Sequence, residues 1–226
     1  MKAAFLAVLA LLAWSQPAAA QLDRITNREA VSALKTALEK GAREAVSTLG
    51  RTNGFFGNPR VRIPLPESLQ KAERTMRRFG LGRYADELEL TMNRAAEAAV
   101  PEARTLLIGA VKKMTVEDAK GILTGGDTAG TAYFRRTTED QLRARFLPIV
   151  GRATARVKLA EKYDEYADWS VRFGLMRRQD ADLNAYVTQK ALDGLFLVIA
   201  DEEKKIRQDP IGSASSIIRK VFGALH

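Results

Sequence analysis

The feature that most constrains the fold is the alanine-rich segment 88–103, which reads LELTMNRAAEAAVPEA. Alanine has the highest helix propensity of all residues, so the segment is predicted to be helical. Apolar residues occupy most faces of this helix, and a helix that is apolar most of the way round is usually buried. We therefore expect the rest of the chain to pack around this helix.

Three polar residues interrupt this apolar segment: Asn93, Arg94 and Glu97. Residues three or four positions apart lie on one side of a helix, so their side chains can meet. A buried polar group must be hydrogen-bonded or paired, and this requirement favours a structural network that fixes the helix to its neighbours. The alternative is a ligand pocket in which Glu97 serves as an acid or a base.

Helical periodicity extends over most of the remaining chain, and strand signals are nearly missing. The sequence predicts one all-α domain at residues 21–226, with seven to nine helices around two buried helices. The second buried helix is expected at 183–208, because its stretch ALDGLFLVIA is apolar all round. Further helices are expected from a capping box at 26–29 to Leu49, and at 66–79, 83–114 with a break at Pro101, 116–123, 138–157 with a kink at Pro148, and from Pro210 onward. The segment from Asp127 to Arg136 is expected to be a short helix at best, because Gly130 weakens it.

Residues with side chains that can cap helices precede several of these segments. Thr115 and either Asp180 or Asp182 are expected at helix starts. Asp127 follows two glycines and is a further candidate. The long helix that ends near residue 157 is expected to begin at Thr137 or Thr138.

Residues 51–66, RTNGFFGNPRVRIPLP, form the one long segment without helical character. Their three prolines, two glycines and two asparagines predict an irregular loop. The loop is too apolar for a flexible linker, so we expect it to pack against the helices through Phe55, Phe56, Val61, Ile63 and Leu65. A short β pairing of residues 61–65 is the alternative.

The first twenty residues have the pattern of a cleavable secretory signal. Lys2 is followed by an apolar run at 3–14 and by the small residues 18–20, which predicts cleavage between Ala20 and Gln21. No later segment has the ~18 apolar residues that a spanning helix needs. We therefore expect a protein that is periplasmic or otherwise exported and soluble after cleavage.

The formal net charge is +9, and removal of Lys2 with the signal leaves +8. Export argues against nucleic acid as the partner of this basic chain, which leaves envelope lipid, polyanionic material or an acidic protein. The helix predicted after Pro210 could lie on an anionic membrane, although docking on its own domain is the favoured interpretation. The interspersed charges also fit an ordinary solvated surface.

The sequence contains no pattern for the common kinds of catalysis. Its only histidine is the terminal His226 and it has no cysteine, so serine–histidine, thiol and zinc chemistry are disfavoured, and no cofactor or metal is predicted. We expect a non-catalytic binding or scaffold module for a lipid, a small apolar or anionic ligand, or a protein partner that covers loop 51–66. The alternative is a carboxylate–arginine enzyme around Asn93, Arg94 and Glu97.

A second candidate ligand site follows the Gly125–Gly126 turn. Backbone amides at the start of the following helix, together with Asp127, Tyr133, Arg135 and Arg136, could surround a small anion. A glycine turn with a capping aspartate and surface arginines is the simpler interpretation, and we favour it.

Several long phrases of the sequence resemble those of domain-of-unknown-function family 4197. This resemblance extends over nearly the whole mature chain and implies an exported, all-helical bacterial envelope protein, with no activity and no functional residue attached. The phrases are NPRVRIPLPESL (58–69), ELTMNRAAEAAVPEA (89–103), KMTVEDAKGILTGGDTAGTAYFRRTT (113–138), RFLPIVGRATARV (145–157) and NAYVTQKALDGLF (184–196).

Overall fold

The computed structural model describes residues 27–80, 82–157, 160, 161, 163 and 182–209. Every secondary-structure element among these residues is a helix, and none is a strand, which confirms the predicted all-α class for this part of the chain. The alternative β pairing at 61–65 does not form. The number of helices in the whole chain stays a prediction. The elements are α2 (Asn27–Leu49), α3 (Glu67–Arg78), α4 (Gly82–Ala99), the 3₁₀ turn η1 (Val100–Glu102), α5 (Ala103–Lys113), α6 (Val116–Thr124), α7 (Ala129–Thr154) and α9 (Leu183–Gln208).

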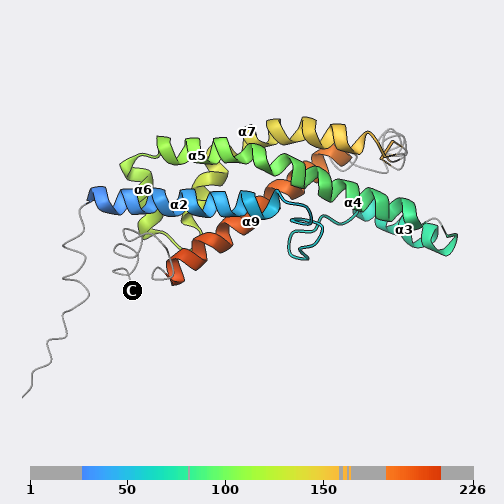
Figure 1. The fold of residues 1–226 in the computed structure, drawn as a ribbon, viewed down its shortest axis with the longest axis horizontal. Coiled ribbons are helices and arrows are strands. Elements are labelled where there is room, and N and C mark those ends of the chain that lie inside the picture. The colour runs from blue at the N-terminus through green and yellow to red at the C-terminus, as the bar shows by residue number, and fades with distance from the viewer. Residues whose placement is uncertain (1–26, 81, 158–159, 162, 164–181, 210–226) are drawn as a thin grey trace, which may run out of the picture.

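The helices form an elongated bundle (Figure 1). Helices α2, α5, α7 and α9 pack around one another, with α2 against α5 and α9, and α7 against α5 and α9. Helix α4 leads through η1 into α5 and packs on α7 and α9, while α3 lies against α4. Figure 1 shows α9 running obliquely across the bundle, so that it touches both the α2 end and the α4 end.

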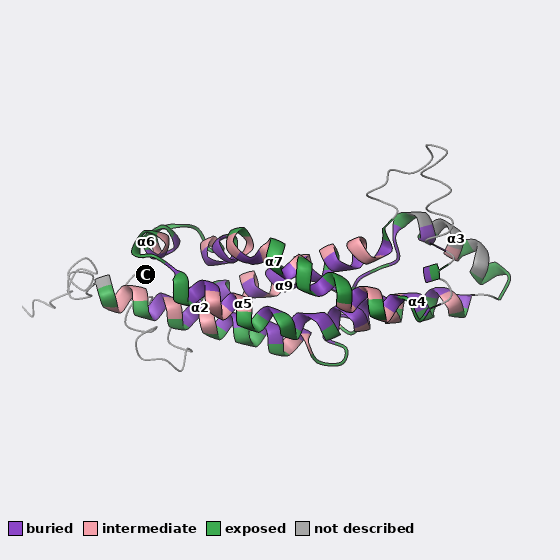
Figure 2. Cartoon of the chain, turned by 90° about the horizontal axis from the view of Figure 1, so that it is seen from above, coloured by how far each residue is buried: buried purple, intermediate pink, exposed green. Residues whose placement is uncertain are grey.

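The interior contains the faces of the two helices that the sequence predicts to be buried, α4 and α9. Most of the apolar and alanine positions of α4 are sealed from solvent (Figure 2). Helices α7 and α9 pack against this face, where alanine side chains are small. Aromatic and aliphatic side chains fill the space between helices, the largest fully buried ones including Phe55, Phe134, Phe146, Phe196, Leu88, Met92, Leu107 and Leu142. The single proline at position 101 separates α4 from α5 by one 3₁₀ turn, as its missing N–H predicts.

Helix α7 begins nine residues earlier than the sequence suggests. The prediction that Thr137 or Thr138 starts a helix is wrong, because both lie inside α7 and their hydroxyls donate to backbone carbonyls of the preceding turn. A threonine in a helix can bond its own helix in this way instead of capping it. Asp127 does not cap α7 either, since Thr128 occupies the capping position and makes no side-chain bond there.

Two other helix starts are as predicted. The Thr115 hydroxyl accepts from the Asp118 amide while the Asp118 carboxylate accepts from the Thr115 amide, which completes a capping box on α6. The Asp182 carboxylate accepts from the Ala185 amide at 2.8 Å and caps α9.

The predicted signal peptide at 1–20 and the helix predicted after Pro210 lie outside the described residues. Within the described part of the chain, every helix is too short or too polar to cross a membrane.

Candidate functional site

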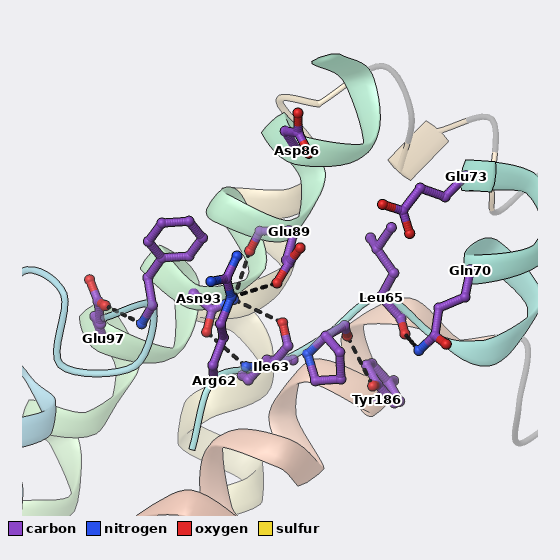
Figure 3. A network of polar contacts seen from close by, with 12 residues as sticks. Arg62, Ile63, Leu65, Gln70, Glu73, Asp86, Glu89, Asn93, Glu97 and Tyr186 are labelled. Carbon is purple, nitrogen blue, oxygen red and sulfur yellow. Dashed lines mark hydrogen bonds and ion pairs between the residues drawn. The ribbon is translucent and has the colours of Figure 1, made fainter. Parts of the chain in front are cut away.

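The loop at residues 51–66 is fixed to α4 by a buried carboxylate. Glu97 is 4% exposed and lies on α4 facing the loop (Figure 3). Its Oε1 accepts hydrogen bonds from the amides of Phe55 at 3.0 Å and Phe56 at 3.1 Å. An amide buried without a partner destabilises a fold, and loop amides have no helical carbonyl to bond. Glu97 therefore provides the acceptor that lets this loop turn inward.

Arg94 is the hydrogen-bond donor to the other oxygen of this carboxylate. Its guanidinium donates to Glu97 Oε2 at 2.6 Å and to the side-chain oxygen of Asn53 at 2.8 Å. Asn53 has a φ of 66°, in the left-handed region that asparagine tolerates better than most residues. Both Glu97 oxygens accept hydrogen bonds from this chain itself, so the carboxylate already has the partners that a buried charge requires.

Asn93 holds the second half of the loop in the same manner. Its side-chain oxygen accepts from the Ile63 amide at 2.9 Å, and its side-chain nitrogen donates to the carbonyls of Ile63 at 2.9 Å and Glu89 at 2.8 Å. The residue is completely buried, and the pair of bonds to Ile63 reproduces the pattern of a neighbouring strand. The loop backbone thus pairs with a side chain instead of with a β-strand.

Helix α9 and surface ion pairs attach the remaining part of the loop. The Tyr186 hydroxyl donates to the Pro64 carbonyl at 3.0 Å, and burial, reinforced by the charge of Glu67, raises the pKa of Tyr186 to about 12. Arg60 makes a bidentate contact with Asp201 of α9, and Arg62 donates to Glu89 of α4 at 2.7 Å. Residues 53–64 are therefore anchored on two helices, and Figure 3 shows the contacts of Arg62 and Ile63 with α4.

Apolar side chains of the loop also pack against the helices. The Phe55 ring is fully buried and lies against Gly194 of α9, where a Cβ would come within 2.7 Å of the ring. A Cβ at Gly54 would come within 2.4 Å of the Leu49 carbonyl oxygen, so the turn after α2 requires glycine. The predicted packing of the loop is confirmed for Phe55, Val61, Ile63 and Leu65, which are buried, while Phe56 is half-buried.

A second buried carboxylate, Glu203, lies outside the candidate sites that the sequence predicts. Its oxygens accept from the amides of Gly130 at 2.9 Å and Thr131 at 2.8 Å, and from the Thr131 hydroxyl at 2.8 Å. Arg207 donates to the same carboxylate at 3.0 Å and to the Ile122 carbonyl at 2.9 Å. Glu203 of α9 thus caps the start of α7, in the place where the sequence suggests an external anion.

One signal in the sequence could have identified Glu203. It lies four residues after Ile199 and three before Ile206, both of which are buried, so it belongs to the apolar stripe of α9. An acidic residue on a buried stripe, with Arg207 four positions later, indicates a buried ion pair.

Two of the residues predicted to bind an anion line a groove between α5, α6 and α7. The groove encloses about 490 Å³, and its lining includes Gly109, Lys113, Asp118, Tyr133, Arg136 and Thr137. Arg136 donates to Asp118 at 3.0 Å, and the Tyr133 hydroxyl donates to the Ala110 carbonyl at 2.8 Å. Burial raises the pKa of Tyr133, and hydrogen bonds from Thr115 lower that of Asp118.

The other two predicted residues of that set lie apart from the groove. Asp127 is exposed in the turn before α7. Arg135 lies 3.4 Å from Glu139 and 3.5 Å from Asp193 of α9, and its guanidinium lies 4.6 Å from the centre of the Phe196 ring. The structure therefore divides the predicted site residues into a loop network, a groove and two separate positions. Among the described residues, no group of three histidine, cysteine or acidic side chains could hold a metal ion.

This architecture defines an all-helical class of protein in which buried polar side chains hold a long loop in place. The chain belongs to the family described as "Protein of unknown function (DUF4197)", which matches residues 24–223 and confirms the resemblance in the sequence. No curated protein and no solved structure matches the chain.

Proposed function

We propose that this protein is an exported, non-catalytic binding module of the bacterial envelope and that loop 51–66 is its recognition surface for a protein partner. The observation that carries the proposal is the attachment of a surface loop by two buried polar side chains, Asn93 and Glu97. Placing a carboxylate and an amide in a helical core is unfavourable unless every bond is made. Here both groups form hydrogen bonds with the backbone of the loop and so fix its position.

A fixed loop is well suited to binding. A flexible segment loses conformational entropy when a partner orders it, whereas a loop already held in one conformation loses little. Binding residues also occur disproportionately on loops that a rigid scaffold positions. The attachment of loop 51–66 to α4 and α9 meets both conditions.

The outer side of the loop carries the groups that such a surface needs. Thr52, Asn53 and Arg60 are exposed, and Phe56 is half-buried with the Arg62 guanidinium 4.2 Å from its ring centre. Aromatic and arginine side chains are enriched at the centres of protein interfaces. This combination favours a protein partner over a purely lipid one.

Both Glu97 oxygens accept hydrogen bonds from the chain itself, which favours a binding module over the alternative of a carboxylate–arginine enzyme. A general acid or base must reach a proton of its substrate, and Glu97 instead contacts the Phe55 and Phe56 amides and Arg94. The signal-like pattern of residues 1–20 supports the exported location.

Site-specific photo-crosslinking in the native host tests the proposal. A benzophenone amino acid at the exposed Thr52 should give a discrete adduct, while the same group at the exposed Ala144 of α7 should not. Combining the Thr52 probe with Glu97→Gln should weaken the adduct, because the Phe55 and Phe56 amides beside the probe lose their acceptor. Absence of any adduct at Thr52, or the same adducts at both positions, would contradict the proposal.

A further inference from the structure

We propose that the groove between α5, α6 and α7 binds a small organic anion, a carboxylate or a phosphate monoester carried on a flat apolar body. The groove is built from residues that do not belong to loop 51–66, so the inference is independent of the partner of that loop. Its volume of about 490 Å³ lies within the ~300–1,000 Å³ range of small-molecule sites.

The charged groups of the groove leave an excess of positive charge. Lys113 and Arg136 line it together with a single carboxylate, that of Asp118. This carboxylate already accepts from the Thr115 amide at 3.2 Å, from the Thr115 hydroxyl at 2.9 Å and from Arg136 at 3.0 Å. Within the part of the chain that the structure describes, Lys113 makes no ion pair, so it is available to an incoming anion.

The inner wall of the groove suits an apolar body beside that charge. Ala110 and Tyr133 are buried there, and the Tyr133 hydroxyl is already bonded to the Ala110 carbonyl. The Arg136 guanidinium lies 5.6 Å from the centre of the Tyr133 ring, which places a cation directly next to an aromatic wall. Thr105, Thr137 and Gln141 add polar side chains along the groove.

Gly109 lines this space without a side chain. A Cβ at this position would meet no heavy atom within 4 Å, although the residue lies in the interior of α5. Glycine inside a helix is less favourable than alanine. A larger side chain at Gly109 would enter open space beside the groove, so this position offers a way to fill it.

Titration of the isotopically labelled protein with phenyl phosphate, benzoate and neutral benzyl alcohol tests the inference by NMR. Saturable shifts of the amides at 109–113 and 133–137 are expected with at least one of the two anions, and the responding anion identifies the headgroup. Benzyl alcohol should leave these amides unchanged. The absence of shifts with both anions, or equal shifts with the alcohol, would overturn the inference.

Two matched pairs of variants locate the site. Gly109→Leu fills the groove and should abolish the shifts, while Gly121→Leu, also placed in open space but on α6 outside the groove, should retain them. Lys113→Gln should weaken binding about fivefold, the effect of one exposed charge, and Lys112→Gln should have no effect. If Gly109→Leu fails to fold, the comparison of Lys113→Gln with Lys112→Gln tests the anion site. Equal affinity of Lys113→Gln and the parent protein would refute an anion site here.

Discussion

At the scale of single residues, this fold uses buried carboxylates as hydrogen-bond acceptors for backbone amides of distant segments. Glu97 accepts from amides about forty positions earlier in the chain, and Glu203 from amides about seventy positions earlier. Each has an arginine on its own helix, Arg94 three residues before Glu97 and Arg207 four residues after Glu203. The pairing supplies the counter-charge that a buried carboxylate requires.

Replacement of Glu97 by glutamine should destabilise the fold by about 1–3 kcal/mol. A glutamine amide has one acceptor and one donor end, so in either orientation a donor faces the Phe55 and Phe56 amides or Arg94. Urea unfolding measures the change, with Glu87→Gln at an exposed position of α4 as the control. Equal stabilities of the two variants would show that Glu97 does not hold the loop.

Tyr186 should titrate late in alkaline solution. Its pKa of about 12 exceeds the ordinary value of 10.0, so folding favours the neutral phenol. The stabilising contribution is complete below pH 10 and is lost as the pH rises through about 12, where the bond to the Pro64 carbonyl breaks. Ultraviolet titration of phenolate absorbance should show this late step, and Tyr186→Phe should remove it. An unchanged titration curve above pH 11 in the variant would contradict the assignment.

At the scale of elements, the sequence predicts much of the framework but not what holds it together. The segment 88–103 contains enough alanine to predict a buried helix, and the spacing of Asn93, Arg94 and Glu97 predicts a polar network there. The partners in that network are backbone atoms of loop 51–66, which every residue type possesses, so no side-chain pattern could reveal them. The sequence around residue 129 does not reveal the start of α7 either, because the carboxylate that caps this helix belongs to Glu203 of α9.

The close approach of α9 to the loop gives a test at this scale. Gly194→Ala should destabilise the fold by about 1–3 kcal/mol, because its Cβ would come within 2.7 Å of the fully buried Phe55 ring. Gly121→Ala, in an open position of α6, should instead stabilise it by about 0.5–1 kcal/mol through helix propensity. Thermal and urea unfolding compare the two. A neutral Gly194→Ala variant would mean that the loop does not press on α9.

At the scale of the whole molecule, the proposed role requires export. If residues 1–20 are a cleaved signal, protein isolated from the native host should begin at Gln21. Amino-terminal sequencing of the envelope fraction checks this expectation, and mutation of Ala18 and Ala20 to bulky residues should block processing. Mature protein that retains Met1 in the cytoplasm would contradict the proposed location.

The proposed function requires that α4 holds loop 51–66 in a single conformation. Amide hydrogen exchange at Phe55 and Phe56, resolved by NMR, measures it most directly, because these two amides donate only to Glu97 among the described residues. We expect both amides to exchange as slowly as those of the buried turns of α4, and to exchange much faster in Glu97→Gln while α4 itself stays protected. Exchange at the rate of an open loop in the unaltered protein would contradict the claim.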